Sequence, residues 1–333
     1  MNKILIVLLL TLIASDIMDS DVILFQQFQR FIKKYNKKYN SMEEFLKRFE
    51  VFKKNVISTF KDNSFHNTGI TKFSDLTRQE FSKIASNINL NDLTINTINS
   101  REAYFVGAAP SSWDWRDRGY NPTIRDQGAC GAFWAFNIMN HLEFLYYRMK
   151  GVMKPFSVQL LIDCDTMDSG CNGGDISTAL SWLKQNGIML ESDYPYTGMK
   201  GTCKKDPSKY IDMKVTGYKK LGSSSSTFSP VDEDEMKEFL YETGPLIVGF
   251  NANALQTYTG GVIDVPSSQC PSSGINYIGI LVGYGYDSVS NKNYWIVQNS
   301  WGKSWGENGY FRIKRGSGTC GINCYVFTAL VSF

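Results

Sequence analysis

Thiols and imidazoles are the side chains of this chain that could act as nucleophiles, general bases or metal ligands. The 333-residue sequence holds seven cysteines, all after residue 129, and only two histidines, His66 and His141. So few histidines leave the cysteines without the partners of a typical mixed metal site. We therefore expect disulfides, one unpaired thiol because the cysteine count is odd, and neither a metal nor another cofactor.

A run of small and aromatic residues has an aromatic side chain where a reactive thiol is expected. It reads Gln127-Gly128-Ala129-Cys130-Gly131-Ala132-Phe133-Trp134. One class of thiol nucleophile follows the pattern Cys-Gly-[Ser/Ala]-Cys-[Trp/Tyr], at a helix N-terminus where its pKa is lowered. The run matches this pattern everywhere except at Phe133, which carries no nucleophilic atom.

The chain resembles papain-like cysteine peptidases of the cathepsin L and viral cathepsin group over almost its whole length. In the larger, C-terminal part the resemblance rests on Trp113-Asp114-Trp115-Arg116, Cys171-Asn172-Gly173-Gly174, Asp193-Tyr194-Pro195-Tyr196, Val282-Gly283-Tyr284-Gly285 and Asn299-Ser300-Trp301-Gly302. In the N-terminal part it rests on the spaced residues Glu44, Arg48, Phe52, Asn55 and Asn63 and on the segment 69–75, with Thr59 and Thr71 departing from the family pattern.

The resemblance implies a role for each position of a catalytic site. Gln127 corresponds to the oxyanion-hole amide, Asn299 to the amide that orients a catalytic histidine, and Trp301 to the residue that shields that amide. The histidine is expected at the start of a β-run that ends Val-Gly-Tyr-Gly, where this sequence has Tyr277. The nucleophile and base positions are thus both substituted, by Phe133 and Tyr277.

No other side chain is expected to replace the missing base. His141 lies eight residues beyond Phe133 on the same expected helix, about 12 Å along its axis, so it cannot face Phe133 across a cleft. We interpret His141 as an ordinary helix residue. A tyrosine with its ordinary pKa near 10 is a poor base at neutral or acidic pH.

These observations lead to four hypotheses about function. The first is a secreted, catalytically inactive peptidase homologue with a peptide-binding, protein-binding or inhibitory role. The second is an active endopeptidase-like hydrolase that uses non-standard catalytic groups. In the third, the N-terminal module is the functional part, as an inhibitor of related peptidases. In the fourth, the chain is a decayed enzyme.

The resemblance also implies a substrate groove and a set of disulfides. Gly173 and Gly174 correspond to the loop along a ligand backbone, where the missing side chains permit close approach. Larger groove residues expected to narrow the neighbouring pocket are Asp175, Ile176, Ile278 and Tyr325, with Trp301 nearby. The implied bridges, each contributing about 2–4 kcal/mol, are Cys130–Cys171, Cys164–Cys203 and Cys270–Cys320. Cys324 is then a free thiol, interpreted as a buried apolar residue.

The elements that must position these residues fall into three predicted parts. Residues 1–15, a cation followed by an apolar run and small residues, read as a secretory signal peptide, which predicts a secretory, extracellular or lysosome- or vacuole-like location. Residues 16–108 read as an inhibitor-type propeptide module that occupies the groove. Its best-supported element is a helix over 42–62, begun by a capping box of Ser41 and Glu44. The Asn- and Thr-rich stretch 86–100 reads as a linker open to proteolysis.

Residues 109–333 are predicted to form a papain-like α+β domain with a helical lobe and a β-barrel-like lobe. The helical lobe includes a buried helix over 132–147, because that stretch is apolar almost all round. Strands are expected near 245–250, 277–282, 294–298 and 310–314, and a surface loop at 223–226. The acidic run 232–235 is expected to open a helix, where carboxylates favour the positive end of the dipole.

Charge composition narrows the range of partners. The chain has 35 basic and 32 acidic side chains, interspersed, for a net charge of +3. Such a balance favours neither nucleic acid nor an anionic membrane. We expect a monomer that binds a peptide or protein ligand, with a related peptidase among the candidates.

Overall fold

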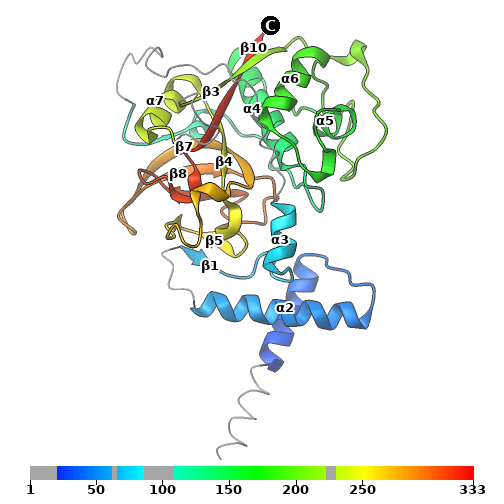
Figure 1. Cartoon of the computed structure of the whole chain (residues 1–333), viewed down its shortest axis with the longest axis vertical. Helices are drawn as coiled ribbons and strands as arrows, with labels where there is room; N and C mark the ends of the chain where they lie inside the picture. Colours follow the sequence, from blue (N-terminus) through cyan, green and yellow to red (C-terminus); the bar gives the residue numbers. More distant parts are fainter. Residues whose placement is uncertain (1–20, 62–65, 86–108, 223–229) are drawn as a thin grey trace, which may run out of the picture.

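Residues 21–61, 66–85, 109–222 and 230–333 are described by the computed structural model. The expected signal peptide, the linker and the loop at 223–226 lie outside these residues. Figure 1 shows three bodies: a small helical module at the bottom, a β-rich lobe above it and a helical lobe beside that lobe. None of the helices within the described ranges is long and apolar enough to span a membrane.

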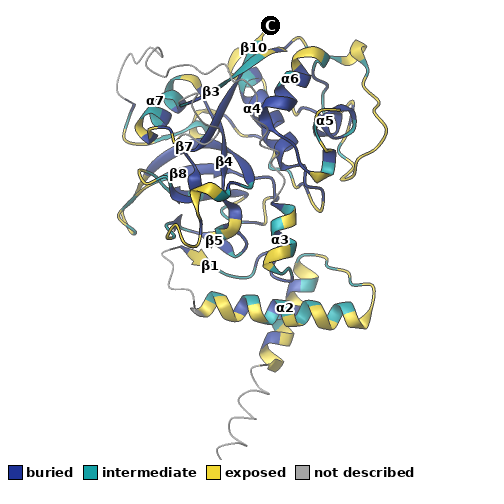
Figure 2. Cartoon of the chain, viewed as in Figure 1, coloured by how far each residue is buried: buried dark blue, intermediate teal, exposed yellow. Residues whose placement is uncertain are grey.

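Two crossed helices form the N-terminal module (Figure 1). One covers residues 21–34, and the other, α2, covers Met42–Lys61. An aromatic core forms at their crossing, where the Phe28 ring lies 5.1 Å from the Phe52 ring. The outer faces of α2 remain exposed, as Figure 2 shows, so the core of this module is confined to the crossing.

The predicted capping box of α2 forms only in part. The Glu44 amide donates to the Ser41 hydroxyl oxygen at 3.1 Å, as predicted. The Glu44 carboxylate, however, accepts from the Asn40 amide at 2.8 Å. The second hydrogen bond of the capping box is therefore made to the amide of Asn40, one residue before the expected N-cap Ser41.

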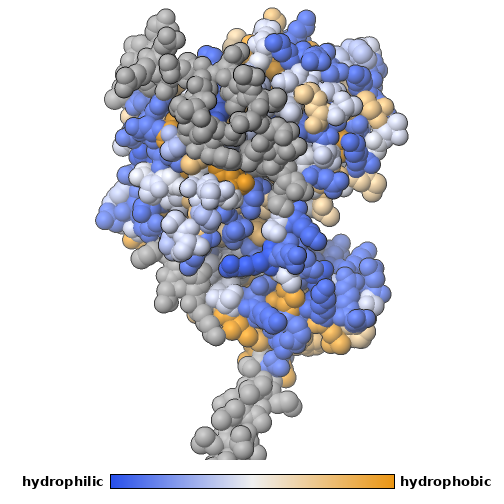
Figure 3. All heavy atoms as spheres, viewed as in Figure 1, coloured by the Kyte–Doolittle hydropathy of each residue, from blue (hydrophilic) through white to orange (hydrophobic). Residues whose placement is uncertain are grey.

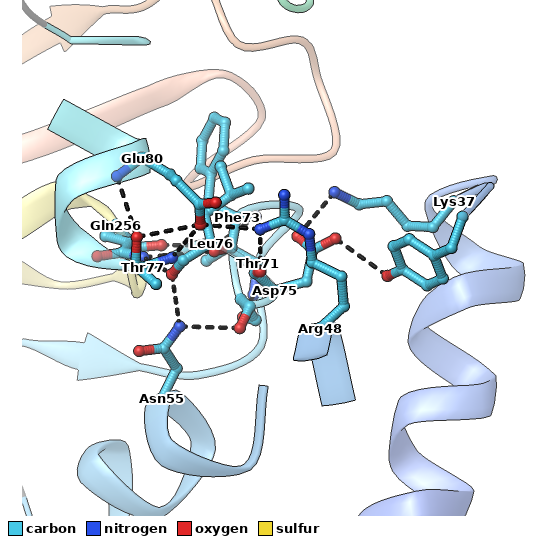
Figure 4. Close-up of polar contacts among 12 residues, drawn as sticks. Lys37, Arg48, Asn55, Thr71, Phe73, Asp75, Leu76, Thr77, Glu80 and Gln256 are labelled. Carbon is cyan, nitrogen blue, oxygen red and sulfur yellow. Dashed lines mark hydrogen bonds and ion pairs between the residues drawn. The ribbon is translucent and has the colours of Figure 1, made fainter. Parts of the chain in front are cut away.

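Side chains of α2 hold the segment that leads toward the larger part (Figure 4). The Asn55 amide donates to the carbonyl oxygens of Ser74 and Leu76 at 2.9 and 2.8 Å. Arg48 forms an ion pair with Glu80 at 2.8 Å. The segment continues through β1 (Asn67–Thr68) and α3 (Arg78–Ile84), so the spaced polar residues of α2 fix its path.

The helical lobe of the larger part is built around α4 (Phe133–Lys150). This helix is buried along most of its length and ends at Gly151, whose φ of 70° stops it. It runs three residues beyond the predicted end, because the prediction followed the apolar residues and the last turn carries Arg148 and Lys150 instead. Packed around it are α5 (Val158–Cys164) and α6 (Ile176–Asn186).

The β-rich lobe is an eight-stranded, mostly antiparallel sheet in the order β3-β10-β4-β7-β8-β9-β6, with β2 paired to β7. Its strands are β2 (Trp113–Asp114), β3 (Lys214–Lys220), β4 (Leu246–Phe250), β6 (Val262–Ile263), β7 (Tyr277–Asp287), β8 (Lys292–Gln298), β9 (Tyr310–Lys314) and β10 (Tyr325–Ser332). A separate β5 (Tyr258–Gly260) pairs with β1 of the N-terminal module. The helix expected from the acidic run is α7 (Glu233–Thr243).

Three disulfides brace the larger part. They join Cys130 to Cys171, Cys164 to Cys203 and Cys270 to Cys320. Cys324 is free and buried, as expected. The first bridge lies directly before α4, so it anchors the loop from which that helix begins.

Candidate functional site

The site lies where the N-terminus of α4 meets the start of β7. Phe133 is the first residue of α4 and Tyr277 the first residue of β7. Their rings stack with centroids 4.6 Å apart and planes 28° apart, and both residues are fully buried. The two positions that the sequence resemblance paired are therefore in contact, and a face-to-face aromatic pair fills the space between them.

The Tyr277 hydroxyl belongs to a buried triangle of polar groups. It donates to the Gln127 side-chain oxygen at 2.7 Å and lies 2.9 Å from the Ser300 hydroxyl. The Ser300 hydroxyl also donates to that Gln127 oxygen, at 2.8 Å. Burial raises the pKa of Tyr277 well above its ordinary value. The phenol therefore remains protonated across the physiological range.

Gln127 is turned away from the role that the resemblance implies. Its Nε2 group donates to the Cys130 carbonyl oxygen at 2.9 Å, while its side-chain oxygen accepts from the two hydroxyls. An oxyanion-hole donor must point at the reacting oxygen. Here the amide instead stabilises the loop before α4 and the substituted aromatic pair.

Asn299 and Trp301 occupy one buried loop next to Tyr277. The Asn299 side-chain oxygen accepts from the Ser300 amide at 2.7 Å. Its Nδ2 group has no hydrogen-bond partner among the described residues. The Trp301 ring lies 5.0 Å from the Tyr277 ring. The Asn299 amide and the Trp301 indole, which the resemblance places around a histidine, are thus present. The Tyr277 ring lies beside them, at the position expected for that histidine.

The expected groove residues are all buried. At Gly174 a side-chain carbon would lie 2.5 Å from the Trp134 ring, so this glycine accommodates Trp134 rather than a ligand. Asp175 is the N-cap of α6, and its carboxylate accepts from the Ser177 amide at 2.7 Å. The Tyr325 hydroxyl donates to the other oxygen of Asp175.

The remaining expected groove positions are buried as well. Ile176 begins α6 and Ile278 follows Tyr277 in β7, and both are fully buried. Gly173 has a φ of 105°, in the region that favours glycine. The large residues that the sequence singled out therefore pack inside the protein, where the Tyr325 hydroxyl donates to the Asp175 carboxylate.

Sequence reasoning missed two residues of this site, Asn137 and Ser300. The Asn137 amide donates to the carbonyl oxygens of Phe133 and Ile278 at 2.8 and 2.7 Å. It therefore ties the first turn of α4 to β7. The one signal in the sequence was an amide inside a helix that is otherwise apolar near its start. Ser300 gave no signal beyond its place in a family motif.

His141 takes no part in the site. It is fully buried, and its Nε2 atom accepts from the Ala329 amide of β10 at 3.0 Å. Burial lowers its pKa to about 3, so the ring is neutral. No group of three or more histidine, cysteine, aspartate or glutamate side chains within the described ranges could hold a metal ion.

The N-terminal module is docked against the same loop. Lys72 forms an ion pair with Asp126 and donates a hydrogen bond to the Trp301 carbonyl oxygen at 3.1 Å. The rings of Phe73 and Phe81 lie 4.8 and 5.5 Å from the Trp301 ring. The chain thus has a two-lobed α+β domain, and an N-terminal helical module packs on the loop that carries Trp301. This arrangement is that of a papain-like proenzyme.

Comparison with known proteins identifies the family. The model described as "Papain family cysteine protease" matches residues 109–330, and that of the "Cathepsin propeptide inhibitor domain (I29)" matches residues 28–81. The chain therefore belongs to the papain family of cysteine proteases. It is in its proform, in which the propeptide inhibitor domain occupies the peptidase domain. Its disulfides and cathepsin-like family are consistent with the secretory pathway or lysosome.

Several relatives are similar over most of their length. "Probable cysteine protease RD19D" of Arabidopsis thaliana is 36% identical over 320 residues, which cover 90% of this chain and 84% of that protein. "Viral cathepsin" of Epiphyas postvittana nucleopolyhedrovirus is 35% identical, covering 89% and 88%. The solved procathepsin L2 of Tenebrio molitor has a TM-score of 0.81 at 29% identity, covering 92% of this chain and 99% of that chain.

Proposed function

We propose that this protein is a catalytically inactive papain-family homologue that binds a peptide or protein without cleaving it, or inhibits a related peptidase. The observation that carries the proposal is the stacked, fully buried pair of Phe133 and Tyr277. Acyl transfer by this family needs a thiolate and an imidazole in contact. A phenyl ring supplies no nucleophile, and removing one such group from another protease costs about a million-fold in turnover.

Tyr277 is a poor substitute for the missing base. A general base must be deprotonated near the operating pH. Burial holds the pKa of Tyr277 well above 10, and its hydroxyl donates a hydrogen bond to the Gln127 side-chain oxygen. The group therefore acts as a structural hydrogen-bond donor.

For the competing function, hydrolysis by non-standard groups, the candidate nucleophile that the described residues place beside Asn299 is Ser300. The Ser300 hydroxyl is next to Asn299 and lies 2.9 Å from the Tyr277 hydroxyl. Its neighbours in the triangle are a phenol and an amide, and neither accepts a proton near neutral pH. Ser300 is also 1% exposed, so a substrate carbonyl has no approach to it in this conformation.

Reversion of both substituted positions tests the proposal. The native chain should leave a fluorogenic peptide uncut at pH 5 and pH 7. The variant Phe133→Cys with Tyr277→His should gain activity that a thiol-alkylating reagent abolishes. A matched control is Phe136→Cys with Tyr277→His, because Phe136 is equally buried on the same helix but faces Tyr196. Cleavage by the native chain that is lost in Ser300→Ala would overturn the proposal.

We infer that the chain does not remove its own propeptide. Without a nucleophile, the linker is either cut by another peptidase or left intact. Purified proprotein held at acidic pH should keep its full mass over hours on a mass spectrometer. Self-conversion that persists after affinity removal of contaminating peptidases would contradict this inference.

A further inference from the structure

The N-terminal module exposes a line of apolar side chains along the outer side of α2. Met42, Leu46, Ile57 and Phe60 are between 42% and 78% exposed. In an α-helix these positions fall within a sector of about 60°, and we call the four residues the α2 stripe. Figure 3 shows apolar side chains gathered on the face of the module that points away from the larger part. A continuous exposed apolar surface of this kind marks an interaction site.

The described part of the chain leaves the stripe uncovered. Arg48 and Asn55, which hold the segment that leads to the larger part, project from the side of α2 roughly opposite to the stripe. The helix over 21–34 packs on a third side, where the Phe28 ring lies 5.1 Å from the Phe52 ring. The outer face of α2 is accordingly exposed in Figure 2, so another molecule can reach it.

The stripe is complementary to itself when two copies of α2 run antiparallel. Met42 and Phe60 are centred on residue 51, and Leu46 and Ile57 are centred between residues 51 and 52. A second copy turned by 180° about this centre places its Phe60 against Met42 and its Ile57 against Leu46. The same contacts repeat at the other end of the pair. A two-fold contact of this kind uses one patch on both copies.

The charges beside the stripe fit the same register. Glu50 and Lys54 are exposed next to the stripe and are centred on residue 52, so Glu50 of each copy faces Lys54 of the other. A parallel pair would instead bring like charges together, which is unfavourable. At the centre, Lys53 is paired with Glu50 of its own chain at 2.8 Å and lies 5.1 Å from the Phe49 ring. Its aliphatic part therefore continues the apolar surface.

From this self-complementarity we propose that the proform is a two-fold dimer, in which the α2 helices of two copies pack antiparallel through their stripes. We expected a monomer from the sequence, so this inference departs from that expectation. A second copy fits better than a membrane surface, because the charges beside the stripe are of both signs rather than mainly basic. Since the stripe lies wholly on the N-terminal module, release of that module would separate the two larger parts. The dimer does not depend on whether the protein cleaves peptides.

Sedimentation velocity of the full chain, expressed in a secretory host, tests the dimer over a range of concentrations. The native chain should sediment as a dimer. Leu46→Glu should weaken the association at least about tenfold, a difference of about 1.4 kcal/mol, because it buries a charge at the contact. Leu46 is 54% exposed, so the variant should keep the native melting temperature of a monomer. Met199→Glu, at a residue 66% exposed on the larger part, is the matched control and should leave the association unchanged.

Charge reversal tests the antiparallel register. Glu50→Lys should weaken the dimer about threefold or more, because each new lysine faces Lys54 of the other copy. Adding Lys54→Glu to the same chain should restore the native association, since both pairs across the contact are then reversed. A double variant that stays as weak as the single one would overturn the proposed register.

Disulfide trapping distinguishes the two directions of packing. A mixture of Leu46→Cys and Ile57→Cys chains under a mild oxidant should form mixed cross-linked dimers. Leu46→Cys alone should not, because its two copies would lie about 16 Å apart along the helices, beyond the reach of about 7 Å for a disulfide. Cross-linking of Leu46→Cys only with itself, or a native chain that stays monomeric at every concentration, overturns the dimer. A monomeric chain that sediments with phosphatidylserine vesicles would assign the stripe to a membrane instead.

Discussion

Phe133 and Tyr277 meet where the first turn of α4 reaches the first residue of β7. The sequence resemblance predicts that these are the positions of the family's nucleophile and base. The rings meet at 4.6 Å, within the range in which aromatic pairs attract. The Tyr277 hydroxyl also recruits Gln127. The two rings therefore form a complementary buried pair, and we expect each to stabilise the packing of the other.

The stability of this pair can be measured. Phe133→Ala should lower the free energy of unfolding by about 3–5 kcal/mol, because it leaves a cavity in a fully buried site. Phe133→Leu should cost less than the alanine variant, since most of the volume is kept. Denaturant unfolding monitored by tryptophan fluorescence gives both values. Equal costs for the two variants would show that packing against Tyr277 contributes little.

Among the elements, the loop from α5 to α6 carries two neighbouring carboxyl groups, the buried Asp165 and the half-buried Asp168. Asp168 accepts from the Asp175 amide at 2.9 Å and from the Thr178 hydroxyl. Burial and then the neighbouring Asp165 raise the pKa of Asp168 to about 8, and burial also raises the pKa of Asp165. This loop contains Cys171 and Gly173, so its protonation bears on the groove wall.

The raised pKa of Asp168 predicts greater stability in acid. The folded state holds the proton more tightly than the unfolded chain, whose pKa is near 3.9. This contribution is full below about pH 4 and is lost as the pH rises toward 8. Asp168→Asn should flatten the decline in unfolding free energy between pH 5 and 8. The exposed Asp117→Asn should leave the decline intact, and a decline unchanged in Asp168→Asn would refute the assignment.

The buried His141 of α4 predicts the opposite dependence. Its folded pKa of about 3 lies below the unfolded value near 6.5, so the neutral ring is favoured by folding. That contribution is present above pH 6.5 and falls by about 1.4 kcal/mol for each pH unit below it. His141→Gln, which keeps an acceptor for the Ala329 amide, should remove this acid-side slope in the same unfolding series. A slope that survives in this variant must come from other groups.

Across the whole molecule, the module and the larger part are joined at the loop that carries Trp301. Figure 3 shows polar surface along the visible junction between the two bodies. The Lys72–Asp126 ion pair crosses that junction at 2.6 Å, and burial lowers the pKa of Lys72. The favourable burial of the Lys72 charge at this interface therefore depends on the Asp126 carboxylate.

Breaking that pair should loosen the module without unfolding the domain. Asp126→Asn leaves Lys72 half-buried without its carboxylate, which is unfavourable. Hydrogen exchange should accelerate in residues 66–85 and stay unchanged in α4 and the sheet. Asp264→Asn, which removes a carboxylate paired with Lys292 and Lys314 away from the junction, is the matched control. Equal effects of the two variants on 66–85 would contradict a local role.

The sequence by itself determined the family architecture, and it predicted that Phe133 and Tyr277 stand at the nucleophile and base positions. Spaced motifs such as Asn299-Ser300-Trp301 predicted the fold, and the cysteine positions implied the bridges, because these features depend on residue identity and order. Helix 42–62 and the β-runs followed from local periodicity. The end of α4 was missed because its last turn is polar and exposed, so no apolar pattern marks it, and the helix ends only at Gly151.

Only the tertiary structure decided how the altered site is arranged. Asn137 bonds Ile278 and Gln127 turns toward Tyr277, and neither contact is readable from a sequence pattern. Gly174 likewise accommodates Trp134, although its motif suggested space for a ligand. Hydrogen-bond partners and packed volumes join residues far apart in the chain, so they are set by the folded arrangement rather than by local order.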